Sequence, residues 1–299
     1  MNIEVAIPCY NEAITIQKVI RDFRAELPEA EVVVYDNNSQ DNSAELAIEA
    51  GARVVPVNQQ GKGYVLRDIF ETSKADIVIL VDGDDTYESR DVRDLIEPII
   101  KKTADMTIGT RLHSNPQEFR KMHHLGNRFL TWLLNITFRT SFQDILSGYR
   151  AFNRCFIENV PLLSAGFEVE TELMIQALEN DMTVCEIPIH YRGRPTGSYS
   201  KLNTFGDGYR IILMIVTLLR DHKPLFVFSF SGLFLMLVGL PIWTIGFFYG
   251  KPDNMYSVFR SVGAIFILSS FGLFLVGLIL NTINVRLLEL RSLLRRKHI

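Results

Sequence analysis

Three aspartates follow an apolar run in the segment ILVDGDDTY, residues 79–87. Only Gly83 interrupts Asp82, Asp84 and Asp85, and carboxylates this close raise one another's pKa unless a cation or hydrogen-bond donors neutralise them. Mg²⁺ and Mn²⁺ take oxygen ligands, and Mg²⁺ is usually held by one or two carboxylates together with substrate phosphates. The segment therefore indicates a divalent metal site, with a solvated Asp/Gly turn as the alternative.

The first hundred residues alternate β-rich runs with amphipathic helical patterns. Strands are predicted at residues 3–8, 31–36, 52–57 and 76–82, and helices at 12–27, 43–50 and 63–73. Such alternation predicts a parallel sheet with right-handed crossovers, in which ligands bind beyond the carboxyl ends of the strands. Polar clusters at 8–12, 36–39 and 82–85 lie at three such ends, so we expect them to converge.

From about residue 105 to 200 the pattern becomes mixed. Further strands are predicted at 106–111 and 184–192, and helices at 126–138 and 168–180. No G-x-G-x-x-G follows the first strand, and Gly61-Lys62 has Pro56 where a P-loop needs its first glycine. These absences argue against a dehydrogenase and against a P-loop ATPase.

Two uncharged apolar runs lie near the end of the 299-residue chain, which is 47% hydrophobic. Residues 224–250 and 261–283 are each long enough to span a bilayer, and their Gly, Ser and Pro content suits membrane helices. Two core helices of a larger soluble protein are the alternative, although too little chain remains to surround them. Their glycines could also pack against a second copy, giving a homo-oligomer.

The charges around these spans predict an orientation. Residues 284–299 form a basic tail and the connecting loop carries little positive charge, so the positive-inside rule places the tail and the large N-terminal domain on the cytoplasmic face. No signal-peptide pattern opens the sequence, and three cysteines without C-x-x-C spacing fit a reducing compartment. Residues 201–223 predict an amphipathic helix on the membrane surface, or else a core helix. A net charge of −3 gives no indication of nucleic-acid binding.

Five segments in order resemble glycosyltransferase family 2, and within it the dolichyl-phosphate mannose synthase-like enzymes, which include bacterial polyprenyl-phosphate glycosyltransferases. The segments are IPCYNEA (7–13), YDNNSQDNS (35–43), VDGDD (81–85), SGYRAF (147–152) and RPTGSYSKLN (194–203). The resemblance covers essentially the whole chain. It implies an α/β fold of the GT-A (Rossmann-like) type at residues 1–200, followed by the interfacial helix and the two transmembrane helices.

The resemblance also implies roles for single residues. Asp84 is expected to bind Mg²⁺ or Mn²⁺ directly, and Asp82 to contact the ribose or to support the metal. Base and ribose would be held by Pro8, Tyr10, Glu12 and Asp36. Relatives often carry a Gln at the position of Thr86, so a third protein ligand to the metal is in doubt here. Asp144 matches an acidic residue that acts as a base in many relatives. Glu168 and Glu170 either line the same part of the site as Asp144 or face solvent.

If the acceptor is a lipid monophosphate, as the resemblance implies, its phosphate is the attacking group. Its second pKa is near ~6, so it is already largely ionised at neutral pH and needs no strong base. The site must instead anchor the phosphate, for which Arg111, Arg194, Ser200 and Lys201 are the candidates. Asp144 is then expected to position the acceptor or a cationic side chain.

The sequence therefore predicts metal-dependent, inverting transfer of a hexose from a nucleotide sugar to polyprenyl phosphate. The two-span tail favours a UDP-sugar and undecaprenyl phosphate, with GDP-mannose as a second donor. One alternative is a processive polysaccharide synthase, although neither Trp132 nor Trp243 lies in a Q-x-x-R-W motif. Another is a non-catalytic, membrane-anchored scaffold that binds a nucleotide.

Overall fold

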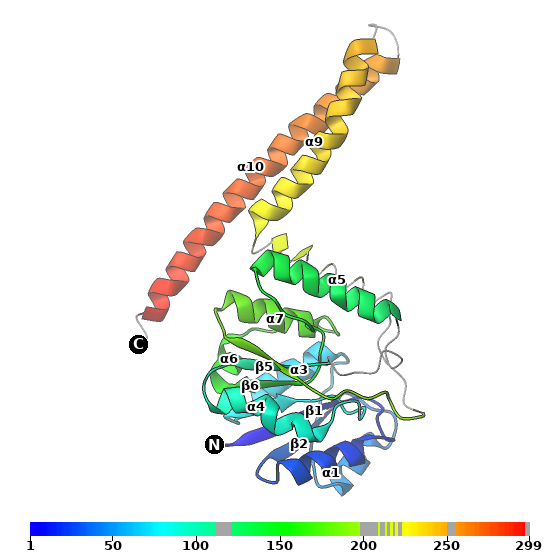
Figure 1. Ribbon diagram of the computed structural model, residues 1–299, viewed down its shortest axis with the longest axis vertical. Helices are drawn as coiled ribbons and strands as arrows, with labels where there is room; N and C mark the ends of the chain where they lie inside the picture. Colours follow the sequence, from blue (N-terminus) through cyan, green and yellow to red (C-terminus); the bar gives the residue numbers. More distant parts are fainter. Residues whose placement is uncertain are drawn as a thin grey trace. The chain divides into compact units, whose positions relative to one another are not determined.

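The chain divides into two compact units, Met1–Ile212 and Leu213–Ile299. The computed structural model describes residues 1–111, 121–197, 209, 213, 216–217, 219–220, 223–249 and 255–296. Ser200, Lys201 and most of the predicted interfacial helix at 201–223 lie outside the described residues. The first unit is an α/β domain, and the second contains two long helices (Figure 1).

The elements of the α/β unit follow the predicted alternation. Its strands are β1 (Ile3–Cys9), β2 (Glu31–Asp36), β3 (Arg53–Pro56), β4 (Ile77–Leu80), β5 (Met106–Thr110), β6 (Arg150–Asn153) and β7 (Val184–Pro188). Its helices are α1 (Ile16–Glu26), α2 (Ser43–Glu49), α3 (Lys62–Thr72), the 3₁₀ turn η1 (Ser89–Asp91), α4 (Val92–Ile100), α5 (Lys121–Phe138), α6 (Arg154–Asn159) and α7 (Val169–Glu179).

Within the described residues, these strands form one sheet in the order β3-β2-β1-β4-β6-β5-β7. The first four strands are parallel, as predicted from their alternation with helices. β6 runs antiparallel to both β4 and β5, and β7 is parallel to β5. No strand was predicted at β6, because its four residues RAFN are too few to show a periodic pattern.

Helices cover both faces of the sheet. On one face, α1 and α4 bury Phe23 and Leu95 against alternate strand residues such as Val5 and Ile79. On the other face, Phe70 of α3 contacts Phe152 of β6, with 5.4 Å between ring centroids. A sheet covered on both faces buries its central strands, which explains the continuous apolar run of β4 and the largely apolar β1, where Glu4 is the exception. Within β1 the buried Glu4 accepts hydrogen bonds from Tyr35 (2.9 Å) and Ser73 (2.8 Å), and the polar clusters that the sequence singled out lie at the strand ends.

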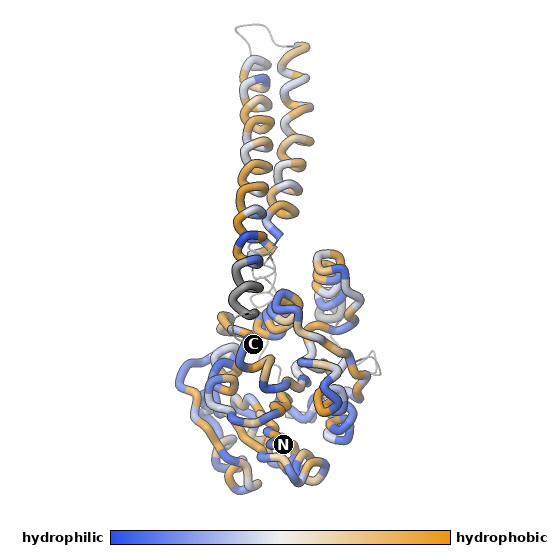
Figure 2. The backbone as a smooth tube through the Cα atoms, turned by 90° about the vertical axis from the view of Figure 1, so that its left-hand side faces the viewer, coloured by the Kyte–Doolittle hydropathy of each residue, from blue (hydrophilic) through white to orange (hydrophobic). Residues whose placement is uncertain are grey.

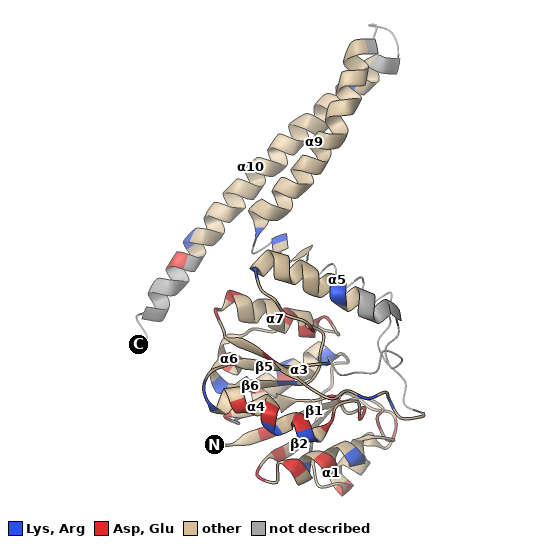
Figure 3. Cartoon of the chain, in the orientation of Figure 1, with Lys and Arg blue, Asp and Glu red and all other residues tan. Residues whose placement is uncertain are grey.

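The second unit contains α9 (Pro224–Tyr249) and α10 (Met255–Arg296), which lie side by side. Both are long and apolar enough to cross a membrane by length and composition. Figures 2 and 3 show their hydrophobic character and the scarcity of charge along them. Only 11% and 17% of their most apolar windows are buried, whereas core helices of a soluble protein would be mostly buried. α10 extends past the predicted span of 261–283 and continues through part of the basic tail.

Glycines set the contact between α9 and α10. A Cβ atom at Gly232 would lie 2.9 Å from the Ser270 carbonyl oxygen, and one at Gly239 would lie 2.7 Å from the Phe266 Cβ. Close backbone approach at small residues is the usual way in which membrane helices associate. Gly232 and Gly239 thus contact α10 within the chain.

Candidate active site

The loops that follow β1, β2 and β4 meet at the carboxyl edge of the sheet, as predicted. Asn11 links the first two loops: its backbone N–H donates to Ser39 Oγ (3.0 Å), and its side-chain oxygen accepts from the Gln40 backbone N–H (2.7 Å). Thr15 Oγ1 donates to the Gly83 carbonyl (2.6 Å), which ties the start of α1 to the aspartate loop. The three polar clusters therefore form one surface.

Each of these loops contains a non-glycine residue with left-handed backbone geometry. Asn11, Asn38 and Asp85 have φ angles of 53°, 67° and 59°. Asn and Asp tolerate this region better than other L-residues because their short polar side chains can hydrogen-bond locally. Backbone conformations of this kind are concentrated at functional sites, where the surrounding structure holds them in place.

Asp82 contacts a buried lysine. Lys62 Nζ lies 2.6 Å from Asp82 Oδ1 and 2.7 Å from Glu170 Oε1, so it bridges the aspartate loop and α7. Burial lowers the pKa of Lys62, but the two carboxylates outweigh burial and raise it above its usual value. The second Glu170 carboxylate oxygen is buried without a hydrogen-bond partner among the described residues, and Asp82 keeps 27% of its side chain exposed. Glu170 is therefore buried beside Lys62, which also contacts Asp82, and does not face solvent.

Asp84 is almost completely buried, with 5% of its side chain exposed. One oxygen accepts from the Thr86 hydroxyl (2.6 Å), and the other lies 2.5 Å from the Arg194 guanidinium. Burial and the neighbouring Asp82 raise the pKa of Asp84, although Arg194 and Thr86 act in the opposite direction. This carboxylate is therefore poorly solvated, and an additional cation would stabilise its charged form.

Asp85 has cations of its own. Its Oδ1 lies 3.0 Å from Lys18 Nζ and 2.5 Å from Arg192 of the segment after β7. Asp82, Asp84 and Asp85 are thus paired with different cations: Lys62, Arg194, and Lys18 with Arg192, respectively. This arrangement explains how three carboxylates can be placed together at the end of one strand.

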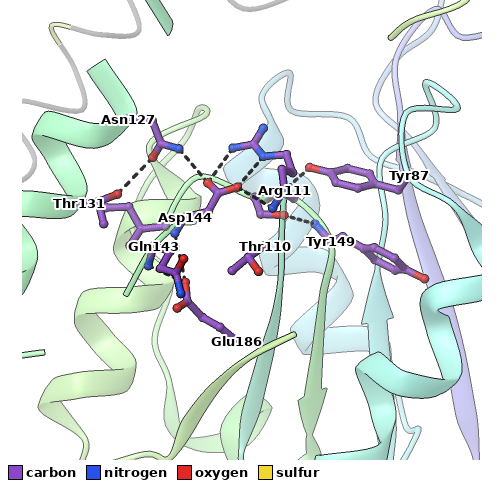
Figure 4. Close-up of polar contacts among 12 residues, drawn as sticks. Tyr87, Thr110, Arg111, Asn127, Thr131, Gln143, Asp144, Tyr149 and Glu186 are labelled. Atoms are coloured by element: carbon purple, nitrogen blue, oxygen red, sulfur yellow. Dashed lines mark hydrogen bonds and ion pairs between the residues drawn. The ribbon is translucent and has the colours of Figure 1, made fainter. Parts of the chain in front are cut away.

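A second charged centre lies between the end of β5 and α5 (Figure 4). Arg111 donates from Nε to Asp144 Oδ2 (2.6 Å) and from its terminal nitrogen to Oδ1 (2.8 Å), a bidentate pair. Asn127 of α5 donates to the same carboxylate (2.8 Å). Burial raises the pKa of Asp144, but Arg111 outweighs burial and holds it below its ordinary value. Asp144 is therefore a weak base and a good anchor for Arg111.

The residues predicted to hold base and ribose lie on the edge formed by β1 and β2. Pro8 and Tyr10 are partly exposed, and Glu12 is buried with an oxygen 3.8 Å from Arg194. Asp36 accepts from the Ser39 N–H (3.2 Å) through one oxygen. Its other oxygen is buried with no hydrogen-bond partner in the part of the chain that the structure describes. Such an atom favours a ligand donor at this position, since unpaired buried polar groups are costly.

The donor set at the end of β4 fits a hard divalent cation. Asp82 and Asp84 supply carboxylate oxygens, the ligands that Mg²⁺ and Mn²⁺ prefer. No group of three His, Cys, Asp or Glu side chains suited to a metal occurs among the described residues. A metal here would therefore share its coordination with substrate phosphates. The Thr86 hydroxyl is engaged with Asp84 and does not replace the missing Gln as a free ligand.

Four residues of these charged clusters were not predicted from the sequence: Lys18, Lys62, Asn127 and Arg192. Lys62 belongs to an incomplete P-loop pattern, although a lysine opening the helix after β3 could have indicated a partner for Asp82. Arg192 lies two residues before Arg194, and this repeated spacing was the available signal. Nothing in the local sequence indicated that Asn127 reaches Asp144.

Comparison with known proteins places the chain in a family. The family model described as Glycosyl transferase family 2 matches residues 4–160, slightly more than half of the chain. Glycosyltransferase AglJ of Haloferax volcanii is 36% identical over 238 residues, which cover 79% of this chain and 78% of that protein. A dolichyl-phosphate hexose transferase of the same organism is 26% identical over 223 residues, covering 74% and 96%.

Solved structures agree with this assignment at the level of the fold. Glucosyl-3-phosphoglycerate synthase from Mycobacterium tuberculosis, in complex with Mn²⁺, uridine diphosphate and phosphoglyceric acid, superposes with a TM-score of 0.59. It is 22% identical, and the match covers 73% of this chain and 78% of that one. The predicted GT-A fold is confirmed. From the family match and the AglJ similarity, the chain belongs to glycosyl transferase family 2 and is a glycosyltransferase.

Proposed function

We propose that this enzyme transfers a hexose from a nucleotide sugar to a polyprenyl phosphate, with Mg²⁺ or Mn²⁺, and inverts the anomeric configuration. The observation that carries the proposal is the aspartate loop: Asp82 and Asp84 stand where the β1 and β2 loops converge, with Arg194 beside them. Carboxylates at this edge suit a metal shared with a diphosphate. Arg111 supplies a second cation in the same unit.

A UDP-sugar is the favoured donor and GDP-mannose the second candidate. The fold is shared with a synthase whose structure contains uridine diphosphate and Mn²⁺. In this chain, Pro8, Tyr10, Glu12 and Asp36 would surround the nucleoside, and the unpartnered Asp36 oxygen would accept from a ribose hydroxyl or a base N–H. Asp82, two positions before Asp84, would complete the diphosphate site.

A polyprenyl phosphate, with undecaprenyl phosphate as our choice, is the proposed acceptor. One relative is named a dolichyl-phosphate hexose transferase, and this chain has two helices long and apolar enough to cross a membrane. The acceptor phosphate would meet Arg111 and Arg194, together with Ser200 and Lys201. Guanidinium groups suit this role because they bind phosphate oxygens in bidentate fashion.

The proposed reaction is a single displacement. An acceptor phosphate oxygen attacks the sugar C1, and the bond from C1 to the diphosphate oxygen breaks with its electron pair leaving on the nucleoside diphosphate. A divalent cation held by Asp84 and Asp82 would neutralise this leaving group. The acceptor is already ionised, with a second pKa near ~6, so Asp144 serves to position Arg111 and not to take a proton.

The proposed setting is the cytoplasmic membrane. Residues 1–200 would form the catalytic domain and 201–223 an interfacial helix, followed by spans at 224–250 and 261–283 and a basic tail at 284–299. The basic tail supports a cytoplasmic location for both the tail and the catalytic domain by the positive-inside rule.

The test is transfer of radiolabelled sugar into an organic-extractable product. Full-length protein in detergent is incubated with Mn²⁺ or Mg²⁺, undecaprenyl phosphate and a panel of UDP- and GDP-sugars. We expect label in the lipid phase from one donor, abolished by EDTA, and a β-linked product from an α-linked donor. Lack of lipid product from every donor would contradict the acceptor, and an α-linked product would contradict inversion.

A further inference from the structure

Asp85 stands outside the metal pair and holds a separate segment of the chain. Its Oδ1 pairs with Arg192 (2.5 Å), which lies 107 positions later, and the Arg192 Nε donates to the Asp85 carbonyl oxygen (2.8 Å). Asp85 is 6% exposed, so water competes little for these contacts. The side chain and the backbone carbonyl of Asp85 therefore both bind the Arg192 guanidinium.

Further contacts fix the same segment on the aspartate loop. The Arg192 backbone N–H donates to the Thr86 carbonyl oxygen (3.0 Å), and the other terminal Arg192 nitrogen lies 3.2 Å from Glu88. Tyr87 and Tyr191 form a β-bridge, with their ring centroids 5.3 Å apart. The segment that follows β7 is therefore attached along residues 85–88.

Arg194 is the residue that this attachment places. It lies two positions beyond Arg192, and its guanidinium is 2.5 Å from Asp84 and 3.8 Å from Glu12. A long arginine side chain loses considerable rotamer freedom when it is held at one point. Anchoring the backbone two residues away lowers this cost by restricting where the guanidinium can go.

We propose that Asp85 is a positioning residue, which acts through Arg192 to hold Arg194 at the metal and diphosphate end of the site. The inference rests on the proposed function, because it assumes that Arg194 acts on the diphosphate or the acceptor phosphate there. In this scheme Asp85 acts through its contacts with Arg192 rather than on the substrate. Asp85, the third aspartate of the DGDD segment, therefore pairs with Arg192 and affects catalysis through the position of Arg194.

Amide hydrogen exchange of the ligand-free protein tests whether Asp85 holds Arg192 and its segment in place. Asp85→Asn keeps a residue that tolerates the left-handed backbone but removes the charge that pairs with Arg192. We expect faster amide exchange in peptides covering residues 189–197, since the Arg192 amide is bonded to Thr86. Arg192→Gln should act in the same way, and Arg192→Lys should act less. Lys18→Gln is the matched control, because it removes the other cation on Asp85 and leaves the segment attached.

A double-mutant cycle tests the route through Arg194. The affinity for UDP with Mn²⁺ and the rate of sugar transfer are measured for Asp85→Asn, Arg194→Gln and the combination. Each single variant should lose about tenfold, as expected for a charged hydrogen bond, and the double variant should match Arg194→Gln alone. The inference would be overturned if the losses of the two single variants multiplied in the double variant, or if Asp85→Asn left amide exchange at 189–197 unchanged. Changed exchange without any lipid-linked product would instead count against the proposed acceptor.

Discussion

Asp84 and Asp144 are both buried aspartates that contact an arginine, but their surroundings shift their pKa values in opposite directions. Asp84 has another carboxylate close by, and together with burial it raises the pKa. Asp144 has Arg111 in bidentate contact and Asn127 as a further donor, which outweigh burial and lower the pKa. The comparison teaches that the charged form of Asp84 stays disfavoured although Arg194 contacts it, so a further cation would stabilise it, whereas Arg111 and Asn127 already stabilise the charged form of Asp144.

The largest effect should follow neutralisation of Asp84. Asp84→Asn should lower sugar transfer by about 100- to 1,000-fold, as is typical when an electrostatic contact to the developing charge is removed. Asp144→Asn should lower it by only about tenfold, because the amide still accepts from Arg111. Transfer rates at saturating Mn²⁺ measure both, with the exposed Asp94→Asn as the control. Equal losses of transfer rate for Asp84→Asn and Asp144→Asn would show that the two carboxylates do not differ in their contribution to transfer.

The order should reverse when stability is measured. Asp144→Ala leaves Arg111 buried without its carboxylate, which should lower the free energy of unfolding by about 3 kcal/mol. Asp84→Ala removes a carboxylate whose charged form is itself disfavoured by burial, so its cost should be smaller. The midpoint of thermal unfolding in detergent measures both variants. A larger loss for Asp84→Ala would show that its partners stabilise the fold more than those of Asp144.

The smallest effect is the pH dependence of stability. In the folded protein the pKa of Asp84 lies above its ordinary value of 3.8. The contribution of Asp84 to the free energy of unfolding therefore falls as the pH rises from 3.8 through the raised pKa. For Asp144 the folded pKa lies below 3.8, so its contribution is complete above that value and is lost as pH falls through the lowered pKa.

Thermal unfolding midpoints of the wild type and both Asn variants, measured from about pH 3 to about pH 6, test these signs. The difference between wild type and Asp84→Asn should decrease with rising pH above 3.8. The difference between wild type and Asp144→Asn should increase with pH below that value. Parallel difference curves would mean that the two environments are electrostatically alike.

Most of the first half of the fold was predictable from the sequence because its local patterns are strong. β1, β2 and β4 are largely apolar and are followed by polar clusters, so the sequence alone located the carboxyl edge of the sheet. β6 could not be found in the same way. It pairs antiparallel between β4 and β5, and that arrangement depends on residues far apart in the chain.

The site was predicted unevenly for the same reason. Asp82, Asp84 and Asp144 carry local motifs, and each lies in a charged cluster of the structure. Which cation serves which carboxylate is decided by tertiary contacts over long separations, such as Arg192 with Asp85 and Lys62 with Glu170. Arg111 was expected to anchor phosphate, and its bidentate pairing with Asp144 could not be derived from spacing.

The left-handed residues of the three loops have a practical consequence for directed evolution of donor choice. Saturation libraries around the nucleotide edge would normally randomise every loop position, yet positions 11, 38 and 85 require positive φ angles. Asn, Asp and Gly enter that region at low cost, whereas most other residues would each lower the free energy of unfolding by about 1–2 kcal/mol. A productive library would hold Asn11, Asn38 and Asp85 fixed and diversify their neighbours.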